Sequence, residues 1–136
     1  MTDLLELTGF HVDDVPDVDA FVARVREFAA QGLEVGHFWV IAAGPKDVRA
    51  ADHVELEFGI SDKPGVGVLA FGQGDEHYVP AHGTNEDEVE YMLGGLHPSY
   101  LPAKAEVPLE DVYAGLDQFL HTQRCPVVLD WIQVSG

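Results

Sequence analysis

The chain of 136 residues carries 24 Asp and Glu against seven Lys and Arg, which gives a formal net charge of −17. Such a charge argues against nucleic acid and anionic membranes as direct partners and favours a basic partner. It is also typical of a generally acidic protein or of one adapted to high salt. The length predicts a single domain, residues 1–136, and a content of 46% hydrophobic residues indicates a packed core.

The N-terminal segment, MTDLLELTGF, has neither the basic start nor the long apolar run of a signal peptide or a membrane anchor. No apolar stretch approaches the ~18–20 residues that span a bilayer. The single cysteine, Cys125, rules out an internal disulfide and fits a reducing compartment. We therefore expect a cytoplasmic protein.

Two segments have the period of an amphipathic helix. Apolar side chains recur at the i, i+3, i+4, i+7 spacing of one helix face over residues 17–31 and again over residues 108–122. Asp17 is a candidate N-cap and Gly32 a candidate stop for the first helix, and Pro108 suits the first turn of the second. The sequence therefore predicts two helices.

The remaining chain reads as β-strands. They are predicted over residues 37–43, 53–60, 66–71, 77–79, 88–93 and 127–134. The SDKPG turn at 61–65 predicts a hairpin, and Trp131 is expected in the core with Val127 and Leu129. Because the connections are short, we expect an α+β fold: a mostly antiparallel sheet of about five or six strands with both helices on one face.

The other face of that sheet is predicted to be acidic. Glu55 and Glu57 share the strand face that points away from the core. The stretch TNEDEVEY, residues 84–91, carries four carboxylates within five positions and has no basic neighbour in sequence. We predict that a partner contacts an acidic surface made of Glu55, Glu57, Asp75, Glu76, Glu86, Asp87, Glu88 and Glu90.

Other chemistry is only weakly indicated. The candidate metal ligands are His53, Glu55, Glu57, His77 and His82. Their spacing matches no ligand motif, so we expect neither a metal nor a cofactor. Cys125 follows the end of a helix, where the dipole disfavours a thiolate nucleophile. The glycines of residues 65–74 suit turns and bulges better than a phosphate cradle, because acidic residues follow them.

Part of the chain resembles a known family. The segments EVEYMLGG and AEVPLEDVYAGLDQFLHTQRCPVVLDW carry the resemblance, together with a strand around residues 67–69. The matching positions include Tyr91, Glu106, Val107, Pro108, Glu110, Phe119, Leu120, Arg124, Pro126 and Trp131. Over residues 65–131 the chain resembles the first-numbered family of immunity proteins from bacterial polymorphic toxin systems. Gln123 departs from the glycine that usually precedes the Arg-Pro element, at the end of the second helix.

The resemblance implies a non-enzymatic α+β protein that binds and silences a cognate toxin. The toxins most often linked to this family are deaminases that act on nucleic acid bases. Such an enzyme holds a polyanion near a zinc-activated water, which requires a basic substrate channel. Carboxylates would then lie where phosphates bind. The alternative is a small-ligand-binding or enzymatic α+β domain with a pocket between sheet and helix.

Overall fold

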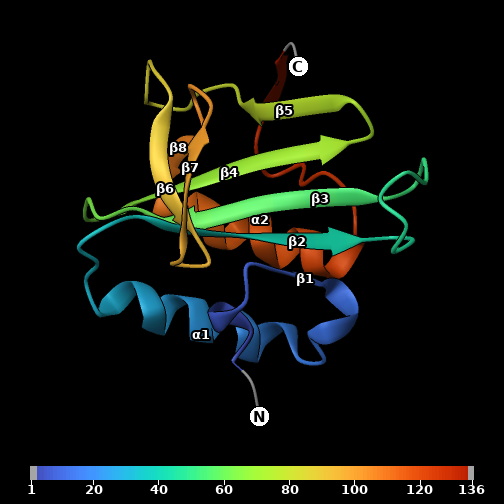
Figure 1. The fold of residues 1–136 in the computed structure, drawn as a ribbon, viewed down its shortest axis with the longest axis horizontal. Coiled ribbons are helices and arrows are strands. Elements are labelled where there is room, and N and C mark those ends of the chain that lie inside the picture. Colours follow the sequence, from blue (N-terminus) through green and yellow to red (C-terminus); the bar gives the residue numbers. More distant parts are fainter. Residues whose placement is uncertain (1–2, 135–136) are drawn as a thin grey trace.

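The computed structural model describes residues 3–134, and Figure 1 shows their arrangement. In chain order the elements are η1 (Leu4–Glu6), β1 (Gly9–His11), η2 (Val12–Asp14), α1 (Val18–Ala30), β2 (His37–Ala43), β3 (Val54–Ile60), β4 (Val66–Gln73), β5 (Glu76–Pro80), β6 (Val89–Leu93), β7 (His97–Leu101), β8 (Glu106–Pro108), α2 (Leu109–Thr122) and β9 (Trp131–Val134). No helix in these residues is long and apolar enough to cross a membrane.

The two α-helices lie where the periodicity predicts them. Oδ1 of Asp17 accepts a hydrogen bond from the Ala20 amide at 3.0 Å and caps α1. Gly32 follows α1 with a φ of 73°, in the left-handed region that glycine adopts without strain. At the end of α2, Gln123 takes the same kind of conformation, with a φ of 58°. A glycine is favoured there, because the Cβ of any other residue strains a left-handed backbone.

The sheet is mixed, and its centre is the antiparallel meander β2–β3–β4. The outer edge of β2 is shared by β1 and β6, which both run parallel to it. The outer edge of β4 is shared by β5 and β8, which both run antiparallel. The main path is β7-β6-β2-β3-β4-β5-β9, with β1 and β8 beside it, so residues 3–134 form a nine-stranded sheet.

The predicted sheet of five or six mostly antiparallel strands was therefore wrong, although the α+β class is right. One cause is length, because β1 and β8 have three residues each and cannot display a period of two. The other cause is connection. The chain reaches β2 from β1 through α1, and β6 arrives after β5 on the opposite side of the meander. Such crossovers permit parallel pairing, which short hairpins do not.

The last strand is also shorter than predicted, since β9 begins at Trp131. The amides of Val127 and Val128 donate to the Gln118 side-chain oxygen on α2 instead of joining the sheet. Val127 is 83% exposed, so its predicted place in the core was wrong. Leu129 and Trp131 are partly buried against the main core, as expected.

Hydrophobic side chains cover one face of the sheet completely and the other only in part. The main core lies between the sheet and the two helices; it includes Val25, Trp39, Leu56, Phe58, Leu116 and Phe119. On the opposite face, the β6–β7 hairpin folds across one end of the meander (Figure 1). There Tyr91 and Leu101 pack against Phe38 and Val68. The rest of this side, between the hairpin and β5, is the open face.

Candidate functional site

The eight predicted contact residues lie in three places. Glu55 and Glu57 are on β3, Asp75 and Glu76 are at the β4–β5 turn, and Glu86, Asp87, Glu88 and Glu90 precede or begin the β6–β7 hairpin. Glu55 and Glu57 are half-buried, whereas the other six are exposed. Within residues 3–134, none of the eight forms an ion pair with Lys or Arg. Apart from Glu55, which is bonded to His53, their charge is therefore available to a partner.

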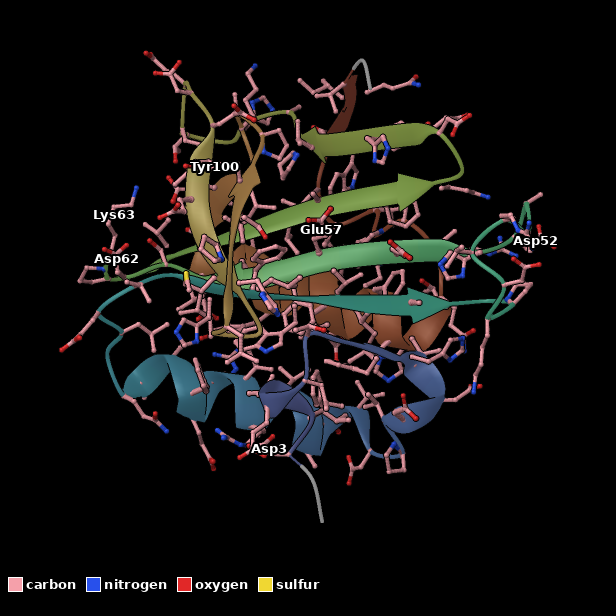
Figure 2. All side chains as sticks on the ribbon, in the orientation of Figure 1. Asp3, Asp52, Glu57, Asp62, Lys63 and Tyr100 are labelled. Carbon is pink, nitrogen blue, oxygen red and sulfur yellow. The ribbon has the colours of Figure 1, made fainter. Side chains whose placement is uncertain are left out.

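The structure separates Glu90 from the β3 carboxylates. On β6, Tyr91 packs inward against the sheet, so its neighbour Glu90 points outward. Glu90 pairs in register with Tyr100 on β7, whose side chain is 66% exposed. Figure 2 shows Tyr100 on the hairpin and Glu57 on the central strands. The sequence does not predict a strand around Tyr100, because the HPSYL segment contains a proline and shows no clear strand pattern.

Glu57 lies at the centre of the open face, on the side of the sheet opposite α2 (Figure 2). The register places it beside Val40 of β2 and Ala70 of β4. A hollow of about 200 Å³ opens over it, and its lining includes Glu57, Ala70, His77, Val79, Pro102 and Val134. Burial is the main cause that raises the pKa of Glu57. The nearby Glu55 raises it further, and His77 opposes the shift.

Glu55 is hydrogen-bonded to a histidine, whereas Glu57 has no bonded partner in the described residues. Nδ1 of His53 donates to the Pro45 carbonyl oxygen at 2.7 Å, and Nε2 donates to Oε2 of Glu55 at 2.8 Å. Because a carbonyl and an ionised carboxylate only accept, this geometry favours the imidazole with hydrogens on both ring nitrogens, which is the cationic form. The bond to Glu55, followed by the bond to Pro45, raises the pKa of His53. Within residues 3–134, Glu57 makes neither a hydrogen bond nor an ion pair.

The TNEDEVEY stretch is held in place by its asparagine. Oδ1 of Asn85 accepts from the Glu106 amide at 2.8 Å, and its Nδ2 donates to the carbonyl oxygens of Pro102 and Asp87 at 3.1 and 2.9 Å. The Lys104 amide in turn donates to the Asn85 carbonyl at 2.8 Å. These bonds fix the backbone, while the carboxylates that follow Asn85 remain exposed.

The buried carboxylate of Glu106 also helps to hold the region around the TNEDEVEY stretch. Glu106 is only 2% exposed and accepts from the Tyr91 hydroxyl at 2.7 Å and from the Lys63 ammonium at 2.8 Å. It thus links β8, β6 and the β3–β4 turn. Tyr91 and Glu106 both belong to the positions that carry the family resemblance, but nothing in the sequence indicates that they are bonded to each other.

The other candidate sites can be placed as well. Within residues 3–134, no three His, Cys, Asp or Glu side chains are grouped to hold a metal ion. His82 lies 3.9 Å from Asp130, away from the His53–Glu55 pair. Burial raises the pKa of the Cys125 thiol to about 11, so it is protonated at neutral pH. The hollow of about 630 Å³ between sheet and helix that Cys125 lines therefore contains no thiolate.

The fold and its surface are those of a small, strongly acidic α+β protein. The profile of the family described as immunity protein Imm1 matches residues 8–133, nearly the whole chain. The chain therefore belongs to the immunity protein Imm1 family. The match also includes most of the N-terminal part, in which the sequence analysis found no resemblance. No curated protein matches the chain. Membership in an immunity family implies a cognate toxin as the partner.

Proposed function

We propose that this protein acts in the cytoplasm as a non-enzymatic inhibitor that binds a cognate toxin through its acidic surface. The family supports a toxin as the partner. The observation that carries the acidic surface is the absence of Lys or Arg partners for the eight carboxylates within residues 3–134. Elsewhere in these residues four acids pair with Lys or Arg, namely Asp3, Asp47, Glu106 and Glu110.

The toxin that fits this surface is an enzyme with a basic substrate channel, and a nucleic-acid deaminase is the leading class. An enzyme that acts on nucleic acid bases must hold phosphates close to its catalytic centre. Carboxylates compete for the same cationic side chains. An acidic protein in that channel prevents the substrate from entering without any chemistry of its own.

Only part of the acidic surface can touch the toxin. A standard interface buries roughly 800 Å² per partner, whereas the accessible surface of this protein is 7447 Å². Carboxylates outside the contact still act at a distance, because they raise the association rate by electrostatic steering. Two roles are therefore expected: contact, which sets dissociation, and steering, which sets association.

Co-expression with the toxin domain encoded beside this gene tests the proposal. The inhibitor should restore growth to cells that produce the toxin domain, and the purified proteins should form a complex on size-exclusion chromatography. A purified deaminase assay on single-stranded DNA or RNA should lose activity as the inhibitor is added. Absence of a complex contradicts the proposed function, and a complex with a toxin of another activity contradicts the deaminase assignment alone.

A further inference from the structure

Glu57 stands where an ionised carboxylate destabilises the free protein. It is half-buried among Ala70, Val79, Pro102 and Val134. It also lies close to a second carboxylate, Glu55, which raises its pKa in addition to burial. Removing charge from water without a bonded partner is unfavourable. A neutral side chain of the same size would avoid this cost, so the fold itself gains no stability from a carboxylate at this position.

Within residues 3–134, no neighbouring cationic side chain is bonded to Glu57. His53 is committed to Glu55 and Pro45 through both ring nitrogens. His77 faces the hollow from β5 and partly offsets the shift in the Glu57 pKa, but it forms no hydrogen bond with Glu57. Lys63 is bonded to Glu106, the fully buried carboxylate. The Glu57 carboxylate on the open face is therefore a hydrogen-bond acceptor for which the described residues provide no donor.

We propose that Glu57 and the hollow above it form a pocket for one arginine side chain of the toxin. This inference rests on the proposed function and deepens it. The planar guanidinium can donate two hydrogen bonds to the Glu57 carboxylate. The apolar lining, which includes Val79, Pro102 and Val134, covers the methylene stem. A hollow of about 200 Å³ admits one such side chain and not a folded element.

The pocket gives Glu57 a different role in binding from that of the six exposed carboxylates. The six exposed carboxylates keep their hydration in the free protein, and exposed ion pairs contribute little to affinity. Glu57 is already partly desolvated by the fold, so pairing it with arginine removes less of its hydration and relieves an unfavourable charge. A pre-formed, centrally placed acceptor of this kind is typical of a binding hot spot.

The experiment compares Glu57→Gln with Glu27→Gln, which makes the same change in charge on the exposed side of α1, outside the acidic surface. Thermal unfolding of the free proteins and dissociation from an inactive toxin domain encoded beside the gene are measured. Glu57→Gln should raise the melting temperature and also speed dissociation by about 30-fold or more. Glu27→Gln should change neither property. No ordinary loss of stability produces this opposite pair of effects.

A double-mutant cycle then identifies the donor. Each arginine of the toxin domain is replaced by alanine, and its effect is measured with the wild-type inhibitor and with Glu57→Gln. One arginine should lose its effect in the Glu57→Gln background. If the wild-type complex is tight but Glu57→Gln dissociates like Glu27→Gln, or if no arginine couples to Glu57, the pocket is overturned and the proposed function stands. If the wild-type protein does not bind, both are overturned.

Discussion

The two acidic regions of this protein differ in how the fold treats their charge. The stretch from Glu86 to Glu90 is rich in carboxylates that are exposed, and its backbone is pinned by Asn85. The open face has fewer carboxylates, but the fold half-buries Glu57 and leaves it without a bonded cation in the described residues. If Glu57 holds an arginine of the toxin as proposed, the density of charge along the sequence does not identify the strongest contact. Desolvation of a single group is the better guide, because the free energy of an ion pair depends on the surrounding dielectric.

The test with the largest expected effect reverses the charge of the exposed region. Replacing Glu86, Asp87, Glu88 and Glu90 with lysine should slow association with the toxin domain. If these residues also lie in the contact, dissociation should speed up, because breaking a desolvated charge pair costs ~2–5 kcal/mol, on the order of 30- to 4,000-fold in affinity. Association and dissociation rates at low and moderate salt measure both effects.

A remote control reverses two charges, Asp13 and Asp14, which are exposed and outside the predicted surface. This variant should slow association modestly, and added salt should abolish the difference because it screens exposed charges. If the quadruple reversal behaves like this control, the exposed region only steers the toxin, and another part of the inhibitor holds it.

The second test weakens the hydrogen bonds of Glu106, which help to hold the exposed region in place. Glu106→Gln should lower the free energy of unfolding by about 2 kcal/mol, because it replaces charge-assisted hydrogen bonds from Tyr91 and Lys63 with weaker ones. Chemical denaturation measures the loss. Glu110→Gln is the control, since its partner Arg26 is exposed and such pairs contribute little. Equal stabilities of the two variants would contradict an anchoring role for Glu106.

A third test separates stability from binding. Gln123→Gly should raise the free energy of unfolding by about 1 kcal/mol, because it relieves a left-handed backbone at the end of α2. Dissociation from the toxin should not change. This contrasts with Glu57→Gln, for which stability and dissociation should both rise. Gln31→Gly at the end of α1 is the control, and it should not stabilise, because Gln31 has a right-handed φ of −71°. A gain there would contradict the strain argument.

The smallest expected effect is a dependence of stability on pH at the edge of the open face. The pKa of His53 is raised in the folded protein by Glu55 and Pro45. Its contribution to stability is therefore fully present below the unfolded pKa of about 6.5 and is lost as pH rises through the folded value. Stability should fall as pH rises above about 6.5, and the fall should be smaller in His53→Gln. Denaturant melts at several pH values measure it, and identical slopes would contradict the His53–Glu55 pair.

Local sequence patterns were sufficient to predict several features of this protein. The helical stripes and the Asp17 cap located both α-helices, since these signals lie within a few turns of chain. The alternation in residues 53–60 correctly turned Glu55 and Glu57 away from the main core. The C-terminal motif indicated the family that the profile match then showed over residues 8–133. Each of these properties depends on residues that are close together in the sequence.

The tertiary structure alone decided the rest. The parallel strands on β2, the Tyr91–Glu106 bond and the hollow over Glu57 all join segments that are far apart in the chain. Glu57 has the same pattern in sequence as its neighbour Glu55. The hollow over Glu57 is lined in part by Pro102 and Val134, which come from the end of β7 and from β9. Burial and pairing of a charge depend on which distant segments meet around it, and a period along one strand carries no information about that.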